Sequence, residues 1–252
     1  MRVAPALASA LVLLALAAFA APSPAASAVP EEVSKAVADT SRPESDRKLD
    51  GDRKPAALLA FAGIKRGLVV GEYLPGGGYY TRLLSDVVGP QGKVYALETT
   101  SWGKDNVQAT EAVLKEPGRG NVVLDLAPLG SFQLKEKVDV FWTTLNYHDL
   151  HVTEYGKVDL AAFNKHVYDS LKPGGIYFIA DHAAAAGTGY TQAPTLHRID
   201  EATVIQEVTA AGFVKAGESE VLRNPADDHS KKVFDPTIRM KTDQFVLVFR
   251  RP

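Results

Sequence analysis

The stretch GLVVGEYLPGGGYYT, residues 67–81, decides the fold of this chain. An apolar run ends at Glu72, three glycines occupy positions 76–78, and apolar residues at helical spacing begin at Tyr80. Because glycine has no Cβ, a ligand can approach the backbone closely where the helix begins. The same glycines also suit a tight turn that binds nothing, so this motif alone leaves both interpretations open.

A second acid stands at the end of the next strand candidate, 93–98, where Tyr95-Ala96-Leu97 precedes Glu98. Nucleoside-binding α/β folds use an acid at this position to bind the ribose hydroxyls. Carboxylates at strand tips are also common where a loop begins in solvent. The pair Glu72 and Glu98, each at the end of a strand candidate, favours a ligand site.

Strand-like and helix-like segments alternate through the rest of the chain. The later strand candidates are 121–125, 138–145, 176–181, 213–221 and 244–250. Alternation of this kind predicts a parallel sheet with right-handed crossovers. The last two candidates have no helix between them, which predicts a closing antiparallel hairpin. Their connection, 223–240, is long for a hairpin, and such loops often bind ligands.

Several of these segments resemble a known family. Residues 67–98 resemble the first two motifs of class I S-adenosylmethionine-dependent methyltransferases, and LKPGGIYFIADH (171–182) is similar to the start of their fifth strand. More narrowly, the chain resembles signal-peptide-bearing bacterial predicted methyltransferases. The segments that carry this likeness are DRKPAALLAF (52–61), LPGGGYYTRLL (74–84), GPQGKVYALE (89–98), LNYHDLH (145–151), ADHAAAAGTG (180–189), LHRID (196–200) and TDQFVLVFRRP (242–252).

This resemblance implies a fold and a cofactor. The fold is α/β, Rossmann-like and doubly wound, with a mostly parallel seven-stranded sheet closed by the antiparallel C-terminal hairpin. S-adenosyl-L-methionine would lie across the carboxyl ends of strands one to four. Its implied contacts are Glu72, Gly76, Gly77 and Gly78 to the methionine part, Glu98 to the ribose, and Asp125, ending strand three, to the adenine amino group. The family usually has glycine in place of Leu74, so we expect the backbone to take a different route there.

The segment after the fourth strand offers candidate catalytic groups. Asn146-Tyr147-His148-Asp149 should line the mouth of the cofactor pocket, with Asn146 on the cofactor side, because open α/β sheets bind ligands at the carboxyl ends of strands. His148 with Asp149 could take a proton from the acceptor, or the pair could only shape a loop. A metal site from these residues with His151, Asp181 and His182 is a further alternative. Histidines suit magnesium poorly, so we expect no metal ion.

Composition excludes several other functions. The formal net charge is −2, so no basic excess indicates nucleic acid as a partner, and a small-molecule substrate is favoured. The sequence contains no cysteine, which rules out disulfides, a thiolate nucleophile and a cysteine-based zinc site. Neither observation predicts an oligomeric state.

The N-terminus is typical of an exported protein. Arg2, an apolar run over 6–19 and Ala26-Ser27-Ala28 fit a signal peptide covering residues 1–28, and an uncleaved anchor is the alternative. Residues 29–66 are then a helical or linker segment, and 67–252 the methyltransferase-like domain. We therefore expect a periplasmic or secreted protein without stable membrane insertion after cleavage.

Three functions remain open from the sequence. The favoured one is S-adenosylmethionine-dependent methyl transfer to an unidentified small acceptor. The second is an exported nucleoside-binding or accessory protein that keeps the fold without turnover, because the cofactor is made in the cytoplasm. The third is a nicotinamide oxidoreductase, disfavoured because Thr81 stands where the dinucleotide fingerprint requires its last glycine.

Overall fold

The computed structural model describes residues 29–252, and one seven-stranded sheet organises them. The predicted signal peptide lies outside the described residues. The strands are β1 (Val69–Tyr73), β2 (Lys93–Thr99), β3 (Val122–Ala127), β4 (Val138–Thr144), β5 (Leu171–His182), β6 (Val214–Ser219) and β7 (Gln244–Arg250).

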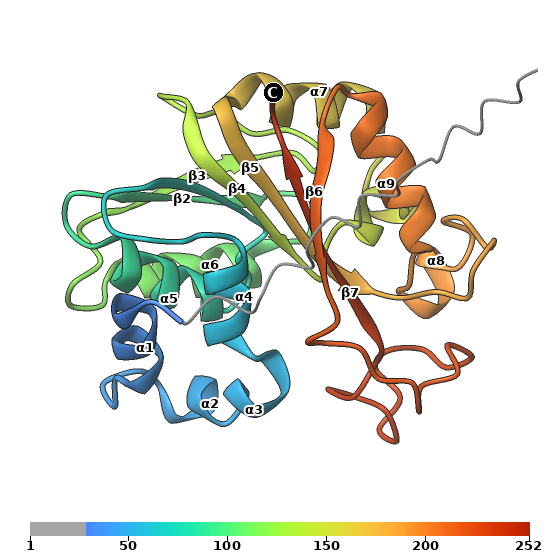
Figure 1. Ribbon diagram of the computed structural model, residues 1–252, viewed down its shortest axis with the longest axis horizontal. Coiled ribbons are helices and arrows are strands. Elements are labelled where there is room, and N and C mark those ends of the chain that lie inside the picture. The colour runs from blue at the N-terminus through green and yellow to red at the C-terminus, as the bar shows by residue number, and fades with distance from the viewer. Residues whose placement is uncertain (1–28) are drawn as a thin grey trace, which may run out of the picture.

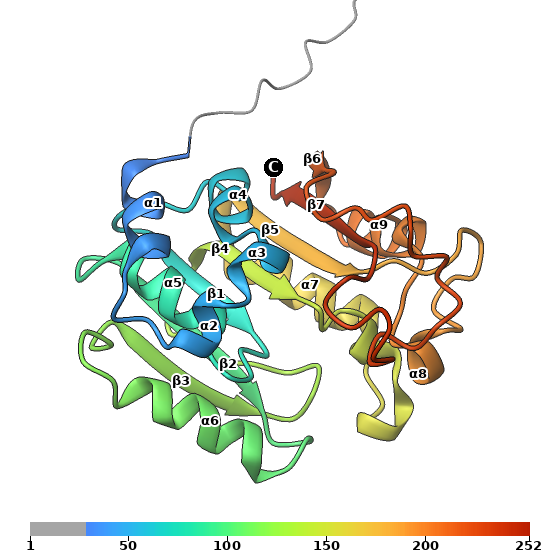
Figure 2. The ribbon, with the colours of Figure 1, turned by 90° about the horizontal axis from the view of Figure 1, so that it is seen from below.

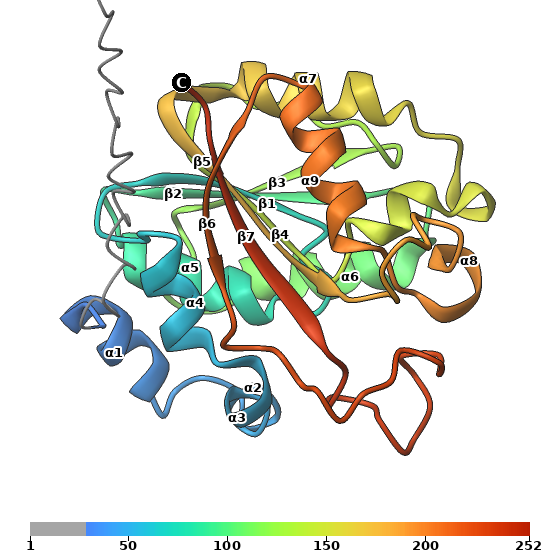
Figure 3. The same cartoon turned by 45° about the vertical axis from the view of Figure 1, so that its right-hand side comes forward.

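The strand order is β3-β2-β1-β4-β5-β7-β6, and the first five strands are parallel to one another. Strand β7 runs antiparallel to β5 on one side and to β6 on the other. Figure 3 shows β7 crossing the molecule beside β6. The predicted mostly parallel seven-stranded sheet with a closing antiparallel hairpin is confirmed.

Helices cover both faces of this sheet (Figure 1). The helices on the face with the N-terminal segment are α1 (Glu31–Ala38), α2 (Glu44–Arg47), α3 (Asp50–Arg53), α4 (Pro55–Phe61), α5 (Tyr79–Val88) and α6 (Lys104–Leu114). The helices on the opposite face are α7 (Leu160–Ser170), α8 (Ala193–Leu196) and α9 (Glu201–Ala210). Two short 3₁₀ helices, His148–His151 and Thr153–Tyr155, follow β4.

The core consists of two apolar clusters, one on each face of the sheet. Successive strand residues point to opposite faces, so Val140 and Trp142 pack with Leu84 of α5, whereas Phe141 packs with Phe163 of α7. All five side chains are buried. Both faces of the central strands are therefore apolar, as a doubly wound fold requires.

The N-terminal segment packs on this core. Of the two expectations for residues 29–66, helix and linker, the helical one describes the structure, since α1 to α4 occupy most of the segment. Val33, Leu58 and Leu59 belong to the same buried cluster as Val70 of β1. Figure 2 shows α2 and α3 near the carboxyl end of β1. Residue 66 is thus no boundary between separate cores.

Within residues 29–252, no helix is both long enough and apolar enough to span a membrane.

Candidate active site

The turn after β1 holds a leucine in an unusual backbone conformation. Leu74 has φ +56°, in the left-handed region, and its amide donates to the Leu97 carbonyl at 2.8 Å. A residue with a Cβ pays roughly 1–2 kcal/mol for this conformation. Leu74 thus adopts a conformation that glycine takes freely, and the expected difference in route from the family stays a prediction.

The three glycines of the turn differ in their surroundings. A Cβ on Gly78 would lie 2.4 Å from Cγ2 of Val113, and Gly78 has φ +76°, so this position requires glycine. A Cβ on Gly77 would meet nothing within 4 Å. The Gly77 carbonyl accepts a hydrogen bond from Nη1 of Arg82 at 2.9 Å, and the same nitrogen contacts Asp46 of α2 at 3.0 Å. Arg82 thereby links the N-terminal helices to the turn.

A cavity of about 410 Å³ opens beside this turn, at the carboxyl ends of β1, β4 and β5. Four of the predicted cofactor-binding residues line it, namely Glu72, Gly76, Gly77 and Asn146. Its rim also includes residues of the N-terminal helices and of the β6–β7 loop, which are Asp46, Leu49, Asp52, Arg53, Val233, Phe234, Arg239 and Met240. The long loop singled out in the sequence thus reaches the cavity.

Glu72 lies at the bottom of the cavity, almost fully buried. Its Oε2 accepts a hydrogen bond from the Thr81 hydroxyl of α5 at 2.6 Å. Burial raises the pKa of Glu72 to about 8, against the lowering effect of that hydrogen bond. Burial thus favours the protonated form of this carboxyl near neutral pH.

Glu98 braces the glycine turn from beneath. Its carboxylate accepts hydrogen bonds from the amides of Gly76 (3.3 Å) and Thr99 (2.8 Å) and from the Thr110 hydroxyl (3.1 Å). Burial raises its pKa, and these three bonds oppose the shift. Neither Glu98 nor Gly78 is among the described residues that line the cavity. The predicted contact of Glu98 with a ribose stays a prediction, and the structural role of Glu98 is to hold the turn.

The structure places Asp125 away from the cavity lining. It lies within β3, two residues before that strand ends, and not at its tip as expected from the sequence. Its Oδ2 accepts a hydrogen bond from the Gln133 amide at 2.8 Å. The structure therefore gives Asp125 a role in the turn after β3, and the predicted adenine contact stays a prediction.

A second cavity, of about 620 Å³, adjoins the first. The two share five lining residues, which are Leu145, Asn146, His182, Val233 and Phe234. Both predicted catalytic residues, His148 and Asp149, line the second cavity only. Trp102 and Tyr155 also line it, and their rings meet edge to face at 5.6 Å.

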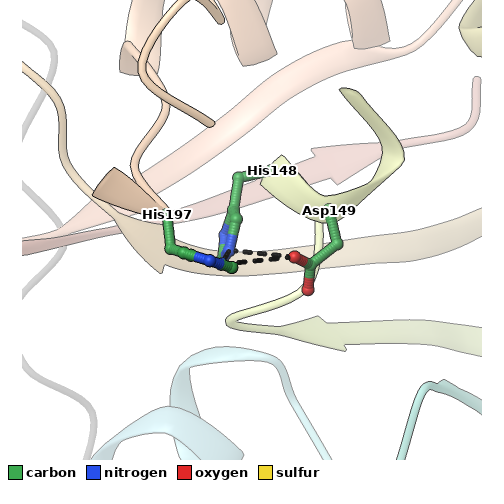
Figure 4. Close-up of side chains that lie close together, drawn as sticks. All are labelled: His148, Asp149 and His197. Atoms are coloured by element: carbon green, nitrogen blue, oxygen red, sulfur yellow. Dashed lines mark hydrogen bonds and ion pairs between the residues drawn. The ribbon is translucent and has the colours of Figure 1, made fainter. Parts of the chain in front are cut away.

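His148, Asp149 and His197 converge at the wall of the second cavity (Figure 4). Nε2 of His148 lies 3.2 Å from Oδ1 of Asp149 and 3.4 Å from Nδ1 of His197. On the other side of the ring, Nδ1 of His148 lies 2.8 Å from Oδ1 of Asp181. The 3₁₀ helix after β4 supplies the first two residues, and the end of α8 supplies His197.

The histidines of this region have opposite protonation preferences. Burial opposes protonation of His148, but the carboxylates of Asp181 and Asp149 outweigh it and raise its pKa to about 10. Burial lowers the pKa of His182 to about 3, so His182 is neutral near pH 7. Burial alone would raise the pKa of Asp149, but the combined lowering effect of His148 and His197 is larger, so the net shift is downward. His148 and Asp149 thus form an ion pair, not a neutral base beside an acid.

Sequence reasoning missed two contributors to the site. In the sequence, His197 stands only within LHRID (196–200), one of the segments that carry the family resemblance, and no spacing rule connects it to His148. Arg53 and its neighbours in α2 and α3 were assigned to a possible linker, although they line the first cavity. In the structure, Arg42 and Asp46 of this segment are buried and pair with Asp50 and Arg82.

The fold matches solved structures of methyltransferases. A SAM-dependent methyltransferase from Aquifex aeolicus is 20% identical, with a TM-score of 0.59 over 87% of this chain and 98% of that chain. A putative sarcosine dimethylglycine methyltransferase from Galdieria sulphuraria is 16% identical, with a TM-score of 0.59 over 82% and 87%. The cyclase SpnF is 15% identical, with a TM-score of 0.57 over 82% and 81%. No family model and no curated protein matches the sequence.

These likenesses establish the fold. The chain has the Rossmann-like fold of class I S-adenosylmethionine-dependent methyltransferases, and its two cavities lie at the carboxyl ends of the strands, where such folds bind ligands. One of the similar structures is a cyclase, so the fold alone does not fix the reaction.

Proposed function

We propose that this protein transfers a methyl group from S-adenosyl-L-methionine to a small-molecule acceptor. One observation carries the proposal: two adjoining cavities meet at Asn146 and His182, at the carboxyl ends of the central strands. A reaction between a bound cofactor and a second substrate needs two compartments that share a wall. The cofactor is assigned to the first cavity and the acceptor to the second.

The first cavity suits a nucleoside with a charged amino acid part. Its volume, about 410 Å³, is in the range of small-molecule sites. The amides of the glycine turn lie at the N-terminus of α5, and the carboxyl of Glu72 can pair with an ammonium group once it ionises. An ammonium ligand would thereby release the proton that burial keeps on Glu72.

The second cavity favours an acceptor with an aromatic or apolar body and a polar group. Trp102, Tyr155 and Phe234 give it flat apolar walls, and Asp149 offers a carboxylate to a hydroxyl or an amine. The protonated ring of His148 stands beside that carboxylate and can stabilise negative charge on an acceptor oxygen.

Methyl transfer requires few catalytic groups from the protein. The methyl moves from sulfur to the acceptor in one displacement, so alignment of the two substrates and exclusion of water dominate the rate. The acceptor proton must leave where the acceptor is a hydroxyl or an ammonium. We assign its uptake to the Asp149 carboxylate, while the protonated His148 ring beside it stabilises negative charge on the acceptor.

We further propose that the protein is exported to the periplasm or beyond. Support comes from the sequence alone: Arg2, the apolar run and Ala26-Ser27-Ala28 fit a cleaved signal. Mass spectrometry of protein from its native host should find a mature N-terminus near Val29 or Ala21. Soluble cytoplasmic protein that retains Met1 would refute export.

Binding and turnover must be measured together to test the function. Calorimetry with S-adenosylhomocysteine should show one site per chain, and a transfer assay with labelled S-adenosylmethionine and a panel of phenols, catechols and amines should show product. Binding without transfer to any acceptor of the panel would favour the accessory-protein alternative. Absence of binding at millimolar S-adenosylhomocysteine would refute the proposed function and leave only the fold established.

A further inference from the structure

Three side chains at the wall of the second cavity present their donor atoms to one point. Nε2 of His148, Oδ1 of Asp149 and Nδ1 of His197 form a triangle with sides of 3.2, 3.4 and 3.7 Å. A triangle of these sides has a circumradius of about 2.0 Å, so an ion slightly out of its plane lies about 2.1 Å from all three atoms. Zinc binds imidazole nitrogen and carboxylate oxygen at this distance.

The side lengths of the triangle also match those expected between ligands of a tetrahedral metal ion. Three ligands of a tetrahedral ion at about 2.1 Å are separated by about 3.4 Å, close to the sides observed. All three residues are buried, and no backbone movement is needed to bring the donor atoms together. The geometry of the site is therefore formed before any ion arrives.

Asp181 orients the first ligand from behind. This fully buried carboxylate lies 2.8 Å from Nδ1 of His148 and also accepts the His148 amide at 2.8 Å. Because Asp181 keeps a hydrogen on Nδ1, Nε2 is the ring atom that loses its proton when a metal ion binds beside Asp149 and His197. A carboxylate behind a metal-binding histidine commonly fixes the tautomer and ring orientation of that ligand.

His197 is held in place at some cost. Its φ is +56°, a conformation that costs a residue with a Cβ roughly 1–2 kcal/mol, and it ends α8. The adjacent Arg198 is buried and pairs with Asp227, which anchors the chain on that side. Strained backbone of this kind tends to occur where a side chain must be aimed.

We propose that His148, Asp149 and His197 bind one divalent transition-metal ion, with zinc as the ion that the donor set favours. Two imidazoles and one carboxylate suit zinc and its neighbours better than magnesium or calcium. Since the three residues line a cavity, a fourth position would face the space assigned to the acceptor. The sequence-based expectation of no metal did not consider His197. The proposal does not depend on methyl transfer, because occupancy is measured without cofactor or acceptor.

Titration of the chelator-treated full chain with Zn²⁺ tests the proposal by calorimetry. One ion per chain should bind, and Co²⁺ as a probe should give the visible absorption of a four-coordinate site. Asp181→Asn should weaken Zn²⁺ binding by roughly 10- to 100-fold. His197→Ala and Asp149→Asn, which remove a ligand each, should weaken it at least as much. Melting temperatures verify that each variant is folded.

A histidine–carboxylate pair elsewhere provides the matched control. His229 Nε2 lies 3.0 Å from Oδ2 of Asp243 in the β6–β7 loop, outside the second cavity. His229→Ala should leave Zn²⁺ affinity within about twofold of the wild type. The proposal is overturned if the wild type binds no stoichiometric Zn²⁺, or if folded His197→Ala and Asp149→Asn bind it as tightly as the wild type does. Loss of binding in His229→Ala alone would also overturn it.

Discussion

Asn146 joins the carboxyl ends of two central strands. Its Nδ2 donates to the Leu74 carbonyl after β1 at 3.1 Å and to the Thr144 carbonyl at the end of β4 at 2.7 Å. Both Leu74 and Leu145 have positive φ, +56° and +60°. The rim between the two cavities is therefore a fixed and locally strained piece of backbone, as expected of a ligand site.

Two neighbouring glycines should separate ligand binding from stability. Gly77→Ala places a methyl in open space at the wall of the first cavity, so S-adenosylhomocysteine affinity should fall by at least about tenfold with an unchanged melting temperature. Gly78→Ala would collide with Val113 in a left-handed conformation and should destabilise the fold by roughly 1–3 kcal/mol. Calorimetry and urea unfolding measure the two effects. The reverse pattern would contradict the assignment of the cavity.

Glu98→Ala should weaken cofactor binding. The change removes the acceptor of the Gly76 amide and any contact with the ribose, interactions of a charged group worth roughly 1.5–3 kcal/mol. We expect S-adenosylhomocysteine affinity to fall by about 10- to 150-fold. Glu111→Ala, at an exposed position on α6, is the matched control. Equal affinities of the two variants would show that Glu98 takes no part in binding.

Glu72 should make stability depend on pH. Its pKa is about 8 in the folded chain and 4.5 where the carboxyl is free in water, so between these values the carboxyl ionises in the unfolded chain first. The free energy of unfolding should therefore fall, through this group, as pH rises from about 4.5 to about 8, by an amount on the order of a few kcal/mol. Glu72→Gln should remove this pH-dependent contribution to the free energy of unfolding.

Urea unfolding at pH 5 and pH 9 measures the Glu72 effect. The stability of Glu72→Gln relative to the wild type should increase between these two values. A difference between the two proteins that is the same at both values would show that Glu72 is ionised in the folded state, contrary to its burial.

His148→Asn should reduce turnover far more than cofactor affinity. An asparagine amide can replace Nδ1 as the donor to Asp181, so the buried carboxylate keeps a partner. Loss of the ring should lower the rate by roughly 10²–10³-fold, because it removes the charged group that stabilises negative charge on the acceptor. S-adenosylhomocysteine affinity should change by less than about threefold. A rate loss that follows the loss of melting temperature would mean that His148 only braces the loop.

The sheet could be predicted from the sequence because its signals are local. Short apolar or β-like runs located all seven strands, and the absence of a helix before β7 indicated the hairpin. Asp125 shows the limit of the method: the strand runs two residues beyond it, to Ala127, because pairing with β2 continues.

The site could be predicted only in part because its contacts are not local. His148 and Asp149 could be predicted as site residues because they follow β4 directly. His197 lies 49 positions after His148 in the sequence, and only the fold brings the two together. Likewise, residues 41–53 lie in a segment expected to be helix or linker, and contacts distant in sequence, such as the ion pair of Asp46 with Arg82 of α5, bring them to the cavity.

A crystal structure of the chain grown with S-adenosylhomocysteine tests whether the first cavity binds the cofactor. We expect the ligand beside Glu72 and Gly77, with its sulfur directed toward the wall that Asn146 and His182 form between the two cavities. A ligand bound elsewhere on the chain, or a first cavity left empty at saturating S-adenosylhomocysteine, would contradict it.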